Sequence, residues 1–84
     1  HILEHPEMAR MPGTIGEALM HPERVVESVG DPSVRLYYRF YEQTMVGRKY
    51  ACVVVKVAHH DAFVLTAYLT DRVKRGVLLW PNEN

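Results

Sequence analysis

The stretch YACVVVKVA, residues 50–58, decides the fold because its apolar side chains fall on every second position. These positions are Ala51, Val53, Val55 and Val57. A period of two is typical of a strand that buries one face. The other face carries Lys56 together with Tyr50, Cys52 and Val54. The stretch therefore predicts a central strand with one core face and one face that bears functional groups.

Two neighbouring stretches, VRLYYRFYE (34–42) and AFVLTAYLT (62–70), have the same period. Their predicted core residues are Val34, Leu36, Tyr38, Phe40, Phe63, Leu65, Ala67 and Leu69. Their opposite faces carry Arg35, Tyr37, Arg39, Tyr41, Thr66, Tyr68 and Thr70. The connections at 43–49 and 59–61 have hairpin length, and Gly76 precedes a last strand at 77–80. These features predict a four-stranded antiparallel sheet.

The first third of the chain predicts helix and connection. Residues 1–9 are expected to form the end of a helix that breaks at 11–13, where Pro12 and Gly13 stand. Thr14 then resembles an N-cap with Glu17 three residues later, and this second helix should stop near His21, before a proline. Residues 25–29 suggest a short extended segment that closes in a turn at 30–32.

We therefore predict an α+β fold in which one or two N-terminal helices pack on one face of the four-stranded antiparallel sheet. Beneath the helices we expect Leu36, Phe40, Val53, Val55, Phe63 and Leu65, in contact with Ile15 and Leu19. With 84 residues, 48% of them apolar, the chain forms one domain over residues 1–84. Since it begins at His1, we expect it to be part of a longer chain.

Composition narrows the setting of the protein. The longest strongly apolar run, 51–55, is too short to cross a bilayer, and no signal peptide pattern is present, so we expect no membrane partner. The single Cys52 cannot form an internal disulfide, which favours a reducing, cytoplasmic location. The net charge is zero, yet residues 1–33 carry six acidic and two basic residues, whereas residues 34–84 carry eight basic and four acidic ones. A neutral chain can present a basic face in this way.

The pattern also predicts where that face lies. If the three apolar strand faces pack against the helices, six functional side chains project together from the opposite face of the sheet: Arg35, Tyr37, Arg39, Lys56, Thr66 and Tyr68. Cations, phenols and hydroxyls that converge on one surface are suited to binding a phosphodiester. Alternating Arg and Tyr residues are also ordinary cross-strand pairs. Lys56 interrupts an apolar strand and therefore needs a partner or a ligand.

The tripeptide His-Pro-Glu occurs twice, at 5–7 and at 21–23. Both copies suit helix starts, because proline fits the first helical position and glutamate the first turn. His1 and His5 have the spacing of two helical zinc ligands, and residues 59–61 add His-His-Asp. No cysteine pair or His-Glu-x-x-His pattern accompanies them, so we expect no metal and no cofactor.

The order of several motifs resembles a known superfamily. His-Pro-Glu is followed by I-x-x-A-L-x-x-P-x-x-V-x-x-S (15–28), LYYR (36–39), VVVK (53–56) and LTAY-x-T (65–70). This order resembles phage-associated small nucleases of the barnase, EndoU, colicin and RelE-like superfamily (BECR). The resemblance implies helices on one face of a four-stranded antiparallel sheet and metal-independent cleavage of RNA, commonly by toxins. It also places His5 where the family has a histidine near the N-terminus, and it leaves His21 incidental.

These arguments together predict a metal-independent endoribonuclease in which the RNA 2′-hydroxyl attacks the adjacent phosphate. His5 would act as general acid or base, because the unperturbed pKa of a histidine lies near the working pH. Lys56 and Arg39 would stabilise charge on the phosphorane, and Thr66 or Tyr68 would position the phosphate. The residues expected to bind substrate are Arg35, Tyr37 and Thr70.

The expected partners are RNA and an antitoxin or other protein. The alternative is a non-catalytic protein- or RNA-binding module of the same fold. A free-standing ribonuclease is often strongly basic, since phosphate contacts dominate affinity for nucleic acid. This neutral domain would therefore either bind a short or protein-held RNA or be an inactive relative kept for interactions. An RNA-binding module would use Tyr37 and Tyr68 as stacking platforms.

Overall fold

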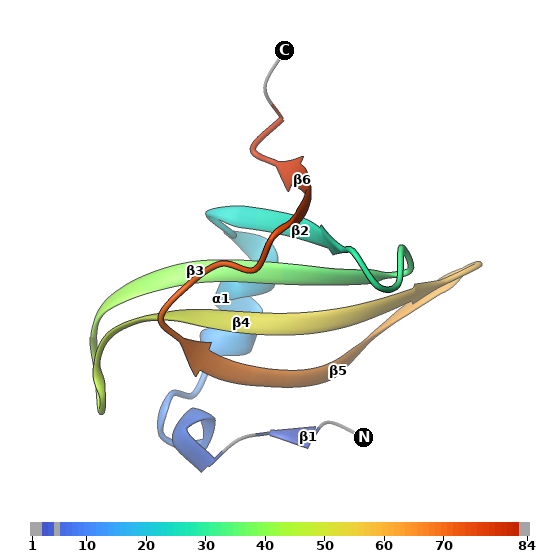
Figure 1. The fold of residues 1–84 in the computed structure, drawn as a ribbon. Coiled ribbons are helices and arrows are strands. Elements are labelled where there is room, and N and C mark those ends of the chain that lie inside the picture. Colours follow the sequence, from blue (N-terminus) through green and yellow to red (C-terminus); the bar gives the residue numbers. More distant parts are fainter. Residues whose placement is uncertain (1–2, 5, 83–84) are drawn as a thin grey trace.

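The computed structural model describes residues 3–4 and 6–82 (Figure 1). The chain runs through β1 (Leu3–Glu4), the 3₁₀ helix η1 (Pro6–Arg10), α1 (Thr14–Met20), β2 (Arg24–Ser28), β3 (Val34–Thr44), β4 (Gly47–Ala58), β5 (Asp61–Thr70) and β6 (Gly76–Trp80). The strands form one sheet in the order β1-β5-β4-β3-β2-β6. All neighbours are antiparallel except β1, which runs parallel to β5.

The predicted fold class was wrong, because the protein is mostly sheet. Five antiparallel strands, with the two-residue β1 at the edge, replace the expected four, and the described part of the chain holds one seven-residue α-helix and one 3₁₀ helix. The extended segment after α1 became an internal strand, β2, because Val25 and Val26 are both buried and its two edges pair with β3 and β6. Residues 3–4 extend along β5 instead of ending a helix.

The helix α1 lies on one face of the sheet, as expected, and it ends where the sequence predicts, with His21 as its C-cap. Its N-cap is Gly13, which has a φ of 85°, and Thr14 is the buried first residue of the helix rather than its cap. Among the described residues, no helix is long and apolar enough to span a membrane.

The register between β3 and β4 overturns the predicted sharing of faces. Tyr37 lies opposite Val53 and Tyr38 opposite Cys52, and directly opposed residues point to the same face. The odd-numbered residues of β3 therefore share the α1 side with Ala51, Val53 and Val55. A register irregularity between Tyr41 and Thr44, close to the turn at 45–46, sets this parity. A shift of one residue moves every side chain of a strand to the other face.

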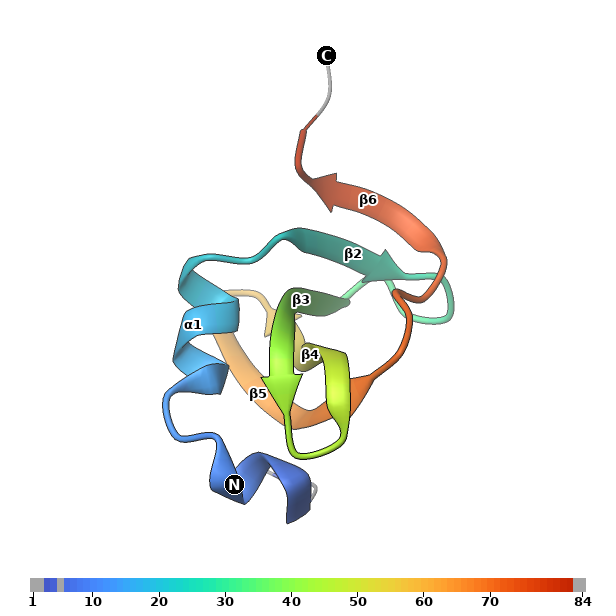
Figure 2. The same cartoon turned by 90° about the vertical axis from the view of Figure 1, so that its left-hand side faces the viewer.

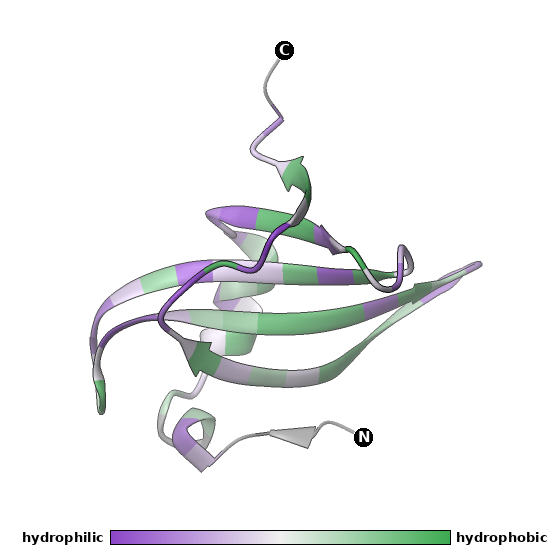
Figure 3. Cartoon of the chain, viewed as in Figure 1, coloured by the Kyte–Doolittle hydropathy of each residue, from purple (hydrophilic) through white to green (hydrophobic). Residues whose placement is uncertain are grey.

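Two cores result, one on each face of the sheet. The back core, on the α1 side, contains Met8, Ala18, Ala51, Val53, Val55 and Ala67, with Ile15 and Leu19 packed against it. The front core, on the opposite side, contains Val26, Leu36, Tyr38 and Cys52, with Val73 packed against it. Figure 3 shows hydrophobic residues along the middle of β4, which contributes to both cores.

Burial of the predicted core residues is mixed. Val53 and Val55 are buried on the α1 side, as predicted, whereas Leu36 is buried on the front. Phe40 is only partly buried. Phe63 and Leu65 remain 50% and 39% exposed. The cause is a bulge in β5: Val54 faces Thr66 but Val55 faces Val64, so Leu65 is an extra residue and the alternation reverses there.

The linker between β5 and β6, residues 71–75, crosses the sheet on the side opposite α1 (Figures 1 and 2). Val73 packs on the front core, and the Lys74 backbone N–H donates to the Tyr38 hydroxyl at 3.0 Å. This crossing delivers β6 to the free edge of β2.

Candidate functional site

Four of the predicted site residues share the front face, which we define as the face of β3, β4 and β5 opposite α1. They are Lys56, Thr66, Tyr68 and Thr70. Thr66 lies opposite Val54, Tyr68 opposite Cys52 and Thr70 opposite Tyr50, all within β4 and β5. Lys56 is two residues along β4 from Val54 and therefore on the same face, and it lies opposite Phe63, beyond the register irregularity between Val54 and Val55.

The other three predicted residues of the sheet, Arg35, Tyr37 and Arg39, lie on the α1 side. The expectation that they share a face with Lys56 was therefore wrong, for the register reason given above. Arg39 has a structural role there: its Nη1 donates to the His21 carbonyl oxygen at 2.8 Å, at the C-terminal end of α1. A cation is favourable at that end of a helix. The guanidinium also lies 5.9 Å from the centre of the Tyr41 ring.

This position makes Arg39→Met a test of the register. We expect the free energy of unfolding, measured in urea, to fall by about 1 kcal/mol, because the His21 carbonyl loses a charged donor. RNA cleavage by the folded protein should not change. Arg35→Met, an exposed residue on the same face, is the matched control and should affect neither quantity. A large loss of cleavage by folded Arg39→Met would return this residue to the site.

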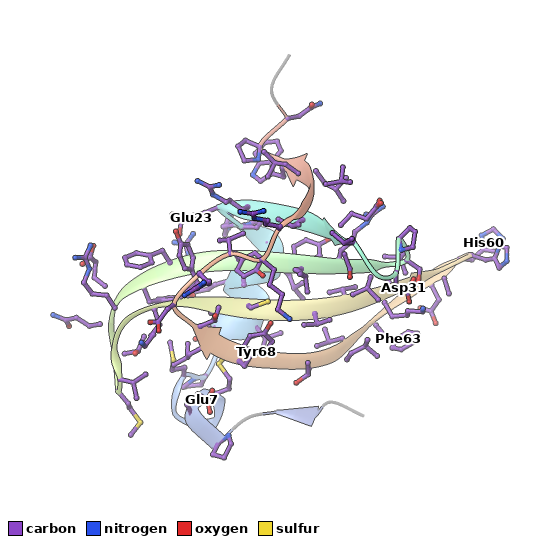
Figure 4. The ribbon with its side chains drawn as sticks, viewed as in Figure 1. Glu7, Glu23, Asp31, His60, Phe63 and Tyr68 are labelled. Carbon is purple, nitrogen blue, oxygen red and sulfur yellow. The ribbon has the colours of Figure 1, made fainter. Side chains whose placement is uncertain are left out.

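Lys56 has a partner within the chain. Its Nζ lies 2.8 Å from Oδ2 of Asp31, in the turn that leads into β3 (Figure 4). Oδ1 of the same carboxylate accepts hydrogen bonds from the backbone N–H and the hydroxyl of Ser33. The hydrogen bond from Lys56, reinforced by those from Ser33, holds the pKa of Asp31 well below its usual range. The lysine in the apolar strand is thus compensated by an aspartate, and both side chains remain partly exposed.

The ion pair predicts a pH dependence of stability. The pKa of Asp31 is lower in the folded than in the unfolded state, so its contribution is complete above about pH 4, the ordinary pKa of an aspartate. It is lost only as the pH falls through the lower, folded-state value. We expect Asp31→Asn to lower the urea midpoint by a constant amount between pH 7 and about pH 4, and the gap to close below. Asp61→Asn controls for charge; a gap that closes above pH 5 would contradict the assignment.

Tyr68 lies beside two buried side chains, Tyr38 and Cys52, in the middle of the front face (Figure 4). Burial raises the pKa of Tyr38 to about 12 and raises that of Tyr68 further above its ordinary value. Both phenols therefore stay protonated at physiological pH and act as hydrogen-bond donors. Burial also raises the pKa of the Cys52 thiol, which excludes a resident thiolate nucleophile at this position.

The described residues that flank position 5, in the first His-Pro-Glu segment and just before it, lie beside β5. Immediately before this segment, Leu3 pairs with Thr66 and Glu4 with Ala67. Within it, the Glu7 carboxylate lies beneath β5, 3.4 Å from the Leu69 backbone N–H (Figure 4). His5 itself, like the His1 of the candidate metal pair, lies outside the described residues. The described residues on either side of position 5 therefore lie along the strand that carries Thr66 and Tyr68.

The second His-Pro-Glu segment connects α1 to the sheet. The His21 backbone carbonyl accepts the hydrogen bond from Arg39, and the Glu23 carboxylate accepts one from the Phe40 backbone N–H. The imidazole of His21 is exposed. The His21 carbonyl and the Glu23 carboxylate therefore link this segment to β3 and stabilise the fold.

Two pockets among the described residues have linings that do not include Lys56, Thr66 or Tyr68. A pocket of 270 Å³ is lined by Leu19, Tyr37, Val55, Ala62, Phe63 and Val64. A second, of 290 Å³, is lined by Glu23, Arg24, Tyr50, Leu78 and Pro81. Across residues 3–4 and 6–82, no three His, Cys, Asp or Glu side chains gather as a metal site would require.

The sequence interpretation missed Asp31, Tyr38 and Cys52 as neighbours of the predicted site. A signal for Asp31 was present, because Asp-Pro-Ser after a glycine is typical of a turn in which the aspartate side chain bonds to the backbone two residues later. Cys52 was expected on the face of Lys56 but not as a neighbour of Tyr68, and Tyr38 was expected on the core face, since its true face depends on the register between β3 and β4.

Comparison of the chain with known protein families, with curated proteins and with solved structures found no match.

Proposed function

We propose that the chain is a metal-independent endoribonuclease whose site combines His5 with the front-face residues Lys56, Thr66 and Tyr68. The observation that supports this proposal best is the pairing of β1 with β5. It places Leu3 opposite Thr66 and Glu4 opposite Ala67, so the residues directly before position 5 lie beside the strand that carries Thr66 and Tyr68.

The chemistry requires a base, an acid and charge stabilisation. The RNA 2′-oxygen loses its proton to the base and bonds to phosphorus, and the 5′-oxygen leaves with a proton from an acid. The products are a 2′,3′-cyclic phosphate and a 5′-hydroxyl. A histidine suits the proton transfers because its pKa lies near neutrality. Tyr68 donates a hydrogen bond to a phosphate oxygen, since its raised pKa keeps the phenol protonated, and Lys56 balances the phosphorane charge.

The charge distribution on the front supports an anionic ligand. The linker that crosses this face carries three exposed cations, Arg72, Lys74 and Arg75. Lys49, near the start of β4, forms an ion pair with Asp71, the first residue of the same linker. The neutral chain thus places a basic segment on the same face of the sheet as Lys56, and contacts between cations and phosphates are the main source of affinity for RNA.

Lys56 must turn from Asp31 to reach a phosphate, or hold both. This requirement gives a sharp test with three variants assayed on RNA in EDTA. Lys56→Ala should lower the cleavage rate at least about 100-fold, as loss of one transition-state donor does. Lys49→Ala, which removes the same charge from the same strand, should change it little. Asp31→Asn should preserve or raise cleavage, because it removes a carboxylate that competes with phosphate for the ammonium group.

The Lys56–Asp31 ion pair also favours a second candidate, an RNA-binding module without cleavage, in which Lys56 is structural. In that case the wild-type protein binds RNA but leaves it intact, and Lys56→Ala loses stability without a specific loss of RNA affinity. If the wild-type protein cleaves RNA and Lys56→Ala cleaves it at the same rate, the proposed role of this lysine is rejected.

A further inference from the structure

β6 (Gly76–Trp80) is the terminal strand of the sheet. It pairs with β2 on one side only, and in the described part of the chain its other edge has no strand beside it. Such an edge presents unpaired backbone N–H and C=O groups that can pair with another strand. The opposite edge of the sheet differs, because the short β1 covers part of β5 there.

The side chains of β6 do not protect this edge. Its sequence, GVLLW, contains no charged residue, whereas exposed edges in monomeric proteins are usually blocked by charges, bulges or proline. Val77, Leu78 and Trp80 are 57%, 44% and 50% exposed. Val29, which follows β2 near the Gly76 end of β6, is also exposed.

The exposed apolar groups lie on both faces of the strand. Val77 lies opposite Glu27 and Trp80 opposite Val25, whereas Leu78 lies opposite Val26 of the front core. The helix α1 covers β3 and β4 on its side of the sheet, so Val77 and Trp80 lie beyond the helix (Figure 2). A strand added at this edge would therefore cover apolar surface on two faces as well as complete a hydrogen-bond ladder.

We propose that the β6 edge pairs antiparallel with β6 of a second copy of this chain. An isologous dimer uses the same edge from both copies, so its backbone groups are complementary by symmetry. The chain has no net charge to oppose self-association. Charge also selects the antiparallel direction. Lys74 and Arg75 directly precede β6. In an antiparallel pair, these cations of one copy and those of the other lie at opposite ends of the paired strands, roughly 17 Å apart for strands of five residues.

Sedimentation velocity over about 1 µM to about 1 mM, the range in which small interfaces associate, tests this inference. We expect the 9.7 kDa monomer to convert to a species of twice its mass. Val77→Lys should shift the dissociation constant at least about tenfold upward, because a charged side chain on an edge strand opposes strand addition. Met20→Lys makes the same change at an exposed apolar residue of α1 and should dimerise as the wild type does.

Trp80, the only tryptophan of the chain, gives a readout that needs no variant. Its emission should shift to shorter wavelength with concentration, in step with the mass. A wild-type protein that stays monomeric over this whole range overturns the proposal. The proposal is also overturned if folded Val77→Lys dimerises as the wild type does, or if the wild type dimerises without a change in Trp80 emission. In both cases the interface lies elsewhere.

Discussion

Replacing Gly76 with alanine is expected to detach β6 from β2. A Cβ at this position would lie 2.3 Å from the Glu27 carbonyl oxygen and 2.6 Å from Cγ1 of Val26. Neither distance is tolerable, and the oxygen belongs to the backbone of an internal strand that cannot move aside cheaply. We expect the free energy of unfolding to fall by about 1–3 kcal/mol, the usual cost of overpacking. Urea denaturation followed by Trp80 fluorescence measures both stability and the environment of β6.

Gly16→Ala is the matched control for this prediction. A Cβ at Gly16 meets no atom within 4 Å, and the residue lies inside α1. Alanine is favoured over glycine in a helix, so this variant should gain roughly 0.5–1 kcal/mol. Opposite signs for the two variants are therefore expected. An unchanged stability of Gly76→Ala would mean that β6 does not pack against β2 as described.

His5→Ala is expected to lower RNA cleavage by roughly 10²–10⁴-fold, the contribution of a positioned acid or base. The expectation depends on the proposed function and on the path of the chain beside β5. Its measurement is the initial rate of cleavage of a defined RNA in EDTA, with far-ultraviolet circular dichroism to verify folding.

Three other histidine variants serve as controls: His21→Ala, His59→Ala and His60→Ala. All three side chains are exposed, and the last two occupy the turn between β4 and β5. They should retain nearly full activity. Equal loss in His21→Ala would assign the catalytic role to the second His-Pro-Glu segment and contradict the site proposed here.

Much of the secondary structure was predictable from local patterns. The period of two identified β3, β4 and β5, glycine marked the start of β6, and the proline after His21 marked the end of α1. The fold class was not predictable in the same way, because the number of strands depends on which short segments find partners. The short extended segment at 25–29 is an internal strand, β2, because the linker places β6 along its outer edge.

The relative phase of the strands was the main feature that local patterns could not supply. Each strand alternates clearly, but β3 and β4 bury apolar residues on both faces, so alternation alone does not say which set faces α1. Two irregularities decide the matter, one near Thr44 and one at Leu65. They separate Arg39 from Lys56 and expose Phe63.

Within the candidate site, Lys56, Thr66 and Tyr68 share a face as predicted, because Thr66 and Tyr68 lie on the same side of the bulge and β4, which carries Lys56, has no extra residue there. The ion pair with Asp31 was missed, since it joins residues 25 positions apart through the turn before β3. Lys56 was expected to need a partner or a ligand, and its partner is Asp31 of the same chain.

The most direct test of the central claim is the chemistry of the RNA ends produced by the purified protein in EDTA. The proposed mechanism predicts a 2′,3′-cyclic phosphate on one fragment and a 5′-hydroxyl on the other, detected by mass spectrometry, with both absent from the His5→Ala and Lys56→Ala reactions. Intact RNA after incubation with the folded wild-type protein, or fragments that carry 5′-phosphates, would contradict it.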